Sequence, residues 1–187
     1  MILSLFRKDP AKDAARALYA AAAEQARTPF LYTALATPDT VEGRFEQVAL
    51  HVFLILRRLK SEGDAARRMA QLLFDAMFAD LDSSLRELGV GDLSVGRKIR
   101  KLAEDFYGRA GAYEVAMKPD AASGALDETL FRNVYAGAQG APAAALAAYV
   151  RAAAARLAES PLGRILAGVV EFPDPAGIFE GPGEARR

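Results

Sequence analysis

Few side chains in this sequence have the types and spacing that catalysis or metal binding requires. His51 is the only histidine, and the chain has no cysteine. A single imidazole can act as a base or a ligand, but no second histidine or thiol is present to complete a metal or nucleophile site. On a helix, His51 would lie between Gln47 and Arg58 on a narrow polar strip of an otherwise apolar surface. We therefore predict a structural or partner-contacting role for His51 and no catalytic residue.

The carboxylates between residues 75 and 87 are the other candidates for metal binding. Asp75 and Asp82 are two helical turns apart and would share one face of a helix. A di-iron site in a helical protein would also need Glu-x-x-His motifs, and the sequence contains none. Solvated or ion-paired carboxylates are therefore the better interpretation, and we predict neither a metal nor a cofactor.

Asp80 differs from these carboxylates because helical spacing puts it near an apolar face made by Met69, Leu73 and Ala76. A carboxylate beside apolar side chains needs a charged or hydrogen-bonding partner. The arginines of the preceding predicted helix can supply this partner. We therefore predict a structural ion pair between Asp80 and one of three arginines: Arg44, Arg57 or Arg58.

Four basic residues cluster in the first two turns of a predicted helix that begins at Ser94. They are Arg97, Lys98, Arg100 and Lys101. The helix macrodipole disfavours cations near the N-terminus, so helix stability does not explain their placement. The cluster indicates either a plainly solvated face or a contact with an anionic partner, such as RNA, the ribosome or a membrane surface.

The composition indicates one globular domain without a basic excess. The chain has 187 residues, of which 52% are hydrophobic, and 24 basic residues balance 24 acidic ones. The zero formal charge argues against a dedicated nucleic-acid binder. The longest apolar run, residues 48–56, is far shorter than the ~20 residues that span a bilayer. The apolar start MILSLF is too short for a signal peptide. We therefore expect a soluble, cytoplasmic protein.

Helix signals recur along the chain, whereas strand signals are almost absent. Asp9-Pro10 and Thr40 have the residue types of helix starts, and Gly89 that of a helix end. Residues 41–60 are apolar nearly all round, which places their helix at the centre of a domain. We predict an all-α single domain of six to seven helices over residues 1–172. Residues 173–187 are dense in Pro and Gly and should form an irregular or disordered tail.

A second apolar stripe on the predicted helix 64–88 suggests a surface for a partner. Phe74, Phe78, Leu81 and Leu85 follow one another at helical spacing, beside the stripe that should face the core. Two stripes mean burial on two sides or one exposed groove face. In the second case Phe45 and Phe53 of the neighbouring helix would border the same groove, together with the helix 94–113.

The central part of the chain, residues 37–113, resembles the ubiquinol–cytochrome c chaperone family. The resemblance is carried by TPDTxxGRFE at residues 37–46, LHVFLILRRLK at 50–60 and FxDLDSSLRE at 78–87. It continues through GVGDLSVG at residues 89–96 and FYGR at 106–109. These segments occur in order and without gaps.

The resemblance implies a non-enzymatic chaperone that helps to assemble cytochrome b into the cytochrome bc1 complex. Mitochondrial members of this family act near the ribosomal exit and with a small helper protein. For this chain the resemblance therefore implies newly made cytochrome b as client, with the ribosome and a helper protein as further partners. We expect a protein that contacts the inner membrane peripherally.

Two other functions fit the residues taken alone. The apolar interior could serve a carrier or an enzyme for an apolar small molecule, such as a quinone or a lipid. The basic cluster could serve a ribosome- or RNA-binding module. Under the chaperone interpretation, the predicted partner-binding residues are Phe45, His51, Phe53, Phe74, Phe78, Leu81, Asp82, Leu85, Arg86, Arg97, Lys98 and Lys101.

Overall fold

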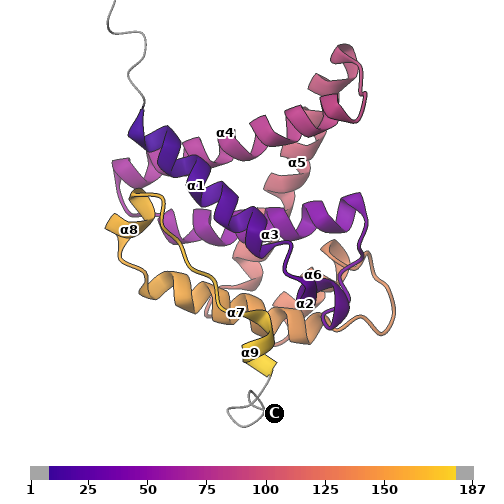
Figure 1. Ribbon diagram of the computed structural model, residues 1–187. Helices are drawn as coiled ribbons and strands as arrows, with labels where there is room; N and C mark the ends of the chain where they lie inside the picture. The colour runs from indigo at the N-terminus through magenta and orange to yellow at the C-terminus, as the bar shows by residue number, and fades with distance from the viewer. Residues whose placement is uncertain (1–8, 180–187) are drawn as a thin grey trace, which may run out of the picture.

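The structure is a computed structural model that describes residues 9–179, with the exception of the Leu93 side chain. Within these residues the chain forms nine α-helices and no strand (Figure 1). Six helices are long: α1 (Pro10–Gln25), α3 (Val41–Leu59), α4 (Asp64–Glu87), α5 (Asp92–Ala116), α6 (Ala125–Asn133) and α7 (Ala143–Glu159). Three have five residues each: α2 (Pro29–Thr33), α8 (Leu162–Leu166) and α9 (Pro175–Phe179). The predicted all-α fold class is confirmed.

Capping side chains explain where α1 and α3 begin. The Asp9 carboxylate accepts a hydrogen bond from the backbone N–H of Ala11, and Pro10 occupies the first helical position. The Thr40 hydroxyl accepts from the backbone N–H of Gly43 and begins α3 in the same way. Both start signals were read correctly from the sequence.

Helix α3 lies in the middle of the molecule, between α4 on one side and α7 on the other (Figure 1). Leu50 and Leu54 belong to a buried cluster shared with α6 and α7. Val52 and Ile55 point into a second cluster shared with α1 and α4. Because α3 supplies side chains to both clusters, it is the central apolar helix that the sequence predicted.

Helices α4 and α5 form an antiparallel hairpin whose joined end projects beyond the rest of the molecule (Figure 1). Gly89, between the two helices, has a φ of 78°, a left-handed conformation that glycine adopts at little cost. The end of α4 and the start of α5 therefore have few neighbours except each other.

The packed part of the chain extends past residue 172, into the predicted irregular tail. Pro175 in α9 is buried, and the Phe179 ring stacks on Phe30 of α2 with ring centroids 5.8 Å apart. The prediction of an irregular segment is therefore wrong for residues 175–179. The remainder of that tail, residues 180–187, lies outside the described residues. No helix among the described residues is long and apolar enough to cross a membrane.

Candidate partner-binding surface

Helix α5 crosses the pair formed by α3 and α4, and aromatic rings fill the crossing. The ring centroid of Phe106 lies 5.7 Å from that of Phe74 and 6.4 Å from that of Phe78. Tyr107 stacks on Phe74 at 5.1 Å. Because α5 covers the middle of the α3–α4 pair, a hollow remains on each side of the crossing.

The first hollow lies between the start of α3, the end of α4 and the first half of α5, and we call it the client groove after the client that the family resemblance implies. Its volume is about 410 Å³. Val41 and Leu88 are 73% and 72% exposed at its edge, which is unusual for large apolar side chains. The groove is therefore apolar and open to solvent. Its apolar lining consists of Val41, Phe45, Leu81, Leu85, Leu88 and Leu102.

Charged side chains surround this apolar lining. Lys98 and Lys101 project from α5, and Lys101 pairs with Asp105 at 2.5 Å. At the inner end, the guanidinium of Arg109 contacts both oxygens of Glu46, at 2.6 and 2.5 Å. A groove with an apolar floor and a charged rim can hold an apolar segment while the free protein stays hydrated.

The Glu46–Arg109 pair joins α3 to α5 beneath the groove. Burial raises the pKa of Glu46, and the hydrogen bonds and charge of Arg109 counteract this shift only in part. The same guanidinium lies 5.9 Å from the centroid of the Phe45 ring, within cation–π distance. The pair therefore fixes both the position of α5 and one wall of the groove.

The predicted apolar stripe is divided between the groove and the interior. Leu81 and Leu85 line the groove, as does Phe45. Phe78 is buried, and Phe74 is covered by the rings of α5. Contrary to the predicted open face, α5 packs directly on both rings, so that Phe78 is buried and Phe74 is half-buried.

Phe53 was also predicted at this surface and is instead buried. Its ring lies 5.4 Å from that of Tyr113, in the cluster between α3, α6 and α7. Helix α5 reaches over α3 at this point, and Phe53 lies beside a different hollow, on the other side of the crossing. The groove therefore extends along the start of α3 only.

His51 is fully buried and cannot contact a partner, so its assignment to the binding surface is wrong. Its Nδ1 donates to the carbonyl oxygen of Gln47 at 2.7 Å, which leaves Nε2 to accept from the Tyr149 hydroxyl at 2.7 Å. Tyr149 in turn accepts from Gln25, which also donates to the carbonyl oxygen of Pro173. Burial lowers the pKa of His51 to about 4. The imidazole is a structural link between α1, α3 and α7.

The predicted ion pair of Asp80 does not form. Asp80 is exposed and accepts a hydrogen bond of 2.6 Å from the hydroxyl of Tyr19, because α1 rather than α3 lies beside this part of α4. The three candidate arginines have other carboxylate partners: Arg44 pairs with Asp39, Arg57 with Glu114 and Arg58 with Glu62.

Asp82 and Arg86 lie on the exposed side of the α4–α5 hairpin. Arg86 contacts Asp82 at 2.7 Å and also pairs with Asp92 at the start of α5. These residues do not line the client groove. They tie the two helices together at the projecting end, away from the groove at which a partner was predicted to bind.

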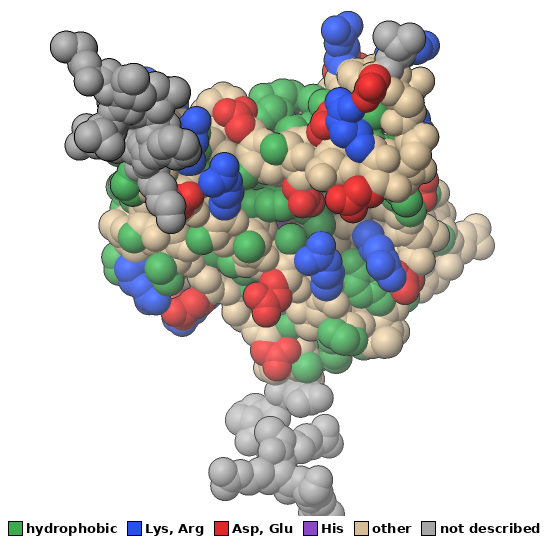
Figure 2. Space-filling view, turned by 45° about the horizontal axis from the view of Figure 1, so that its top comes forward, with side chains coloured by type: hydrophobic (Ala, Val, Ile, Leu, Met, Phe, Trp, Pro, Cys, Tyr) green, Lys and Arg blue, Asp and Glu red, His purple; other side chains and the backbone are tan. Residues whose placement is uncertain are grey.

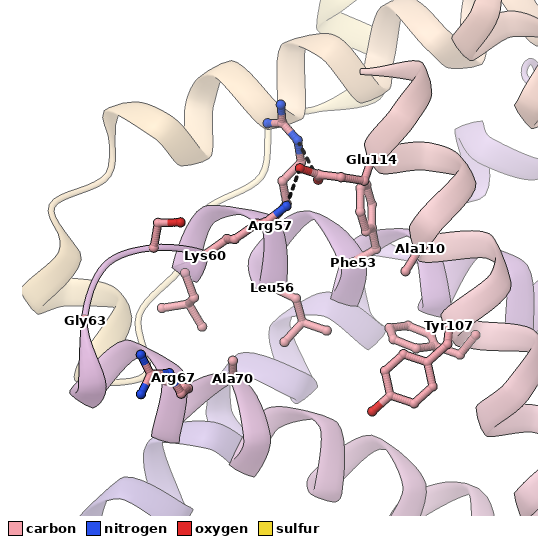
Figure 3. A pocket seen from close by; sticks show the side chains of 13 residues that line it. Phe53, Leu56, Arg57, Lys60, Gly63, Arg67, Ala70, Tyr107, Ala110 and Glu114 are labelled. Atoms are coloured by element: carbon pink, nitrogen blue, oxygen red, sulfur yellow. Dashed lines mark hydrogen bonds and ion pairs between the residues drawn. The ribbon is translucent and has the colours of Figure 1, made fainter. Parts of the chain in front are cut away.

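A second hollow of about 420 Å³ lies on the other side of the α5 crossing (Figure 3). Leu56, Ala70 and Tyr107 form part of its apolar lining. At its mouth Glu114 pairs with Lys60 at 2.8 Å and with Arg57 at 3.4 Å, as the dashed lines show.

The described residues contain no group of three or more side chains that could hold a metal ion.

The motif at residues 37–46 positions α3, and with it one wall of the groove. The Thr37 hydroxyl accepts a 2.6 Å hydrogen bond from the Gln47 side chain. A Cβ on Gly43 would lie 1.9 Å from the carbonyl oxygen of Pro38, so only glycine allows this loop to pack on α3.

The predicted partner-binding set omits eight residues that line the groove. They are Val41, Glu42, Glu46, Ser84, Leu88, Leu102, Asp105 and Arg109. Glu46 and Arg109 both lie in segments that carry the family resemblance, which was the available signal. The pairing itself could not be read, because it depends on how α5 crosses α3.

Comparison with protein families identifies a match over residues 33–172, to the family described as ubiquinol-cytochrome C chaperone. The chain belongs to the ubiquinol–cytochrome c chaperone family. The matched segment contains all the residues of the client groove. The resemblance drawn from the motifs is thereby confirmed, and the description of the family as a chaperone agrees with a non-enzymatic function.

Curated relatives are similar over part of their length. The chain is 26% identical over 129 residues to ubiquinol-cytochrome-c reductase complex assembly factor 1 of Xenopus laevis, covering 69% of this chain and 64% of that protein. The corresponding human protein is 25% identical over 109 residues, covering 58% of this chain and 36% of that protein. The chain thus spans less than two thirds of the length of these relatives.

A solved structure is similar over almost the whole chain. The crystal structure of the Cbp3 homolog from Brucella abortus superposes with a TM-score of 0.81 at 39% sequence identity. The alignment covers 95% of this chain and 99% of that chain. The helical arrangement, including the hairpin that builds the groove, is therefore one found in a bacterial relative.

Proposed function

We propose that this protein is a non-enzymatic assembly chaperone of the ubiquinol–cytochrome c reductase complex and that its client is newly made cytochrome b. Membership in the chaperone family and similarity to complex assembly factors support this function. The single structural observation that supports it is the client groove, which exposes Val41 and Leu88 between charged side chains.

The groove has the chemistry that a membrane-protein client requires. An apolar helix that lies in a groove presents side chains at i, i+3, i+4 and i+7 to it. Phe45 and Leu85 stand on opposite walls, supplied by α3 and α4, and Leu102 completes the lining from α5. Such a surface shields part of one transmembrane helix of cytochrome b until its partners arrive.

Site-specific photo-crosslinking tests this assignment directly. A photo-reactive amino acid at Leu85 should capture cytochrome b in cells, because this side chain lines the groove. The matched control is Val115, which is 61% exposed on the last turns of α5 and away from the groove. Capture of cytochrome b from Val115 as efficiently as from Leu85 would remove the groove from the proposal.

A functional test uses the same pair of positions. In cells that lack the chromosomal gene, Leu85→Glu should fail to restore the b-type haem absorbance of the membranes. A carboxylate in the groove opposes the burial of an apolar client segment. Val115→Glu should restore the absorbance to the wild-type level. Normal haem spectra in the deletion strain itself would contradict the proposed function as a whole.

A further inference from the structure

The projecting end of the α4–α5 hairpin combines exposed cations with an exposed aliphatic side chain. Leu88 is the C-cap residue directly after α4 and is 72% exposed. Arg97, Lys98 and Arg100 in the first turns of α5 are exposed and make no ion pair with any other residue in the range 9–179. Figure 2 shows Lys and Arg side chains gathered on the protruding end at the upper right, with a few acidic side chains among them.

These groups form one continuous surface. Lys98 and Lys101 line the client groove together with Leu88. The same two lysines also border a shallow hollow of about 520 Å³ that Arg97 and Arg100 share. The surface therefore runs from the mouth of the groove across the outer side of α5, and we call it the hairpin tip.

We propose that the hairpin tip docks the protein on an anionic phospholipid membrane, with Leu88 at the acyl boundary and the cations on the headgroups. Basic residues near an anionic leaflet are attracted to its negative surface potential. An amphipathic surface with basic and aliphatic residues binds at this boundary. Asp82 and Asp92 share Arg86, and Asp105 pairs with Lys101. The hollow on the outer side of α5 keeps an excess of cations, because Glu104 is the one carboxylate among its lining residues.

The exposed leucine favours a membrane over RNA. Leu88 gains nothing at a phosphate backbone, whereas it is stabilised by entering lipid. Because the tip adjoins the groove, docking would place a bound apolar segment at the bilayer surface.

Vesicle binding by the full chain tests this proposal without any client. The wild-type protein should co-sediment with vesicles of equal parts phosphatidylglycerol and phosphatidylcholine and bind pure phosphatidylcholine far more weakly. Raising the salt concentration from about 0.15 M to about 1 M should release it, since the Debye length falls from about 8 Å to about 3 Å.

Two pairs of variants locate the surface. Arg97→Gln with Arg100→Gln leaves the groove lining unchanged and should weaken binding to anionic vesicles about 30-fold. This factor corresponds to about 1 kcal/mol for each basic residue, at 1.4 kcal/mol per tenfold. The control is Arg16→Gln with Arg132→Gln, which removes two exposed charges from α1 and α6 and should leave binding unchanged.

The aliphatic contribution is tested by comparing Leu88→Ser with Val115→Ser, which alters another exposed aliphatic side chain, at the far end of α5. Only Leu88→Ser should weaken vesicle binding, by about tenfold. The membrane assignment would be overturned if both arginine double variants lost vesicle binding to the same extent. It would also be overturned if the protein bound ribosomes in a salt-sensitive way and did not bind vesicles. Neither result would contradict the client groove, because crosslinking at Leu85 measures that separately.

Discussion

The ion pair between Glu46 and Arg109 is the most consequential side-chain contact for the groove. Both oxygens of a buried carboxylate face one guanidinium, and this pair holds α5 on α3. Two contacts from one planar donor fix orientation as well as distance. The pair therefore controls the width of the groove without lining its apolar floor.

Replacing Arg109 with alanine should lower the free energy of unfolding by roughly 3 kcal/mol, because it leaves the Glu46 carboxylate buried without a partner. Adding Glu46→Gln to Arg109→Ala should recover part of that loss, since the buried charge is then gone. The measurement is urea-induced unfolding of both variants at neutral pH. Arg132→Ala, which breaks an exposed pair with Glu128, is the control and should cost less than about 1 kcal/mol.

His51 makes the stability of the fold depend on pH in the acidic range. Its pKa is about 4 in the folded chain, below the ordinary value of 6.5, because the buried imidazole is kept neutral. The unfolded chain therefore binds an additional proton between these two values, and stability falls as the pH drops. Well above pH 6.5 the imidazole is neutral in both states and contributes no pH dependence.

Between pH 7 and pH 4 the wild-type chain should lose about 3 kcal/mol of unfolding free energy through His51 alone. His51→Gln should be less stable at pH 7 because the hydrogen bonds to Gln47 and Tyr149 are disturbed. Its stability should nevertheless fall less steeply across this pH range. Urea unfolding at several pH values measures both slopes, and parallel slopes would exclude His51 as the titrating group.

At the level of elements, the packing of the loop 37–40 on α3 depends on one glycine. A Cβ on Gly43 would overlap the carbonyl oxygen of Pro38 at 1.9 Å, so the loop must move away from the helix. Gly108, in the interior of α5, has no heavy atom within 4 Å of the corresponding Cβ position. The two glycines therefore differ in what an added methyl group does.

Gly43→Ala should destabilise the protein by about 1–3 kcal/mol, the usual cost of forcing a methyl group into a packed site. Gly108→Ala should instead stabilise it by roughly 0.5–1 kcal/mol, since alanine has the higher helix propensity. Thermal unfolding followed by circular dichroism measures both. Equal changes in the two variants would show that the contact with Pro38 relaxes without cost.

The sequence predicted the elements well because their signals are local. The caps at Asp9 and Thr40, the turn at Gly89 and the apolar surface of α3 depend only on neighbouring residues. The same helical spacing grouped Phe45, Leu81 and Leu85, which line one hollow in the structure. The sequence could not predict the depth of the groove, because the depth depends on how α5 packs across α3 and α4.

The failed assignments all concern which helix covers a given face. The polar strip with His51 was predicted at the surface, but Tyr149 of α7 closes it. Phe74 and Phe78 were predicted to be open, but α5 crosses them. Asp80 was assigned to an arginine of α3, but α1 supplies Tyr19 from 61 residues away in sequence. Helical periodicity tells which residues share a face and carries no information about the opposing element.

On the scale of the whole molecule, burial is distributed unevenly. Residues 49–55 of α3 are all buried and belong to the middle of the domain. At the hairpin tip, residues 96–101 are all exposed or half-buried. The chain therefore combines a cooperative core with a weakly supported end, which is the end that carries the groove and the proposed membrane contact.

Native-state hydrogen exchange should resolve this difference. Amides of residues 50–55 should exchange only through global unfolding, with a free energy in the range of about 5–15 kcal/mol that is typical of single domains. Amides of residues 97–101 should exchange through local opening, at a free energy several kcal/mol lower and with little dependence on urea, because few apolar contacts are lost. Anionic vesicles should slow exchange at residues 97–101 and leave residues 50–55 unchanged. If the amides of both segments were equally protected from exchange without lipid, the hairpin tip would unfold only together with the core. The tip would then not be a locally unstable part of the fold.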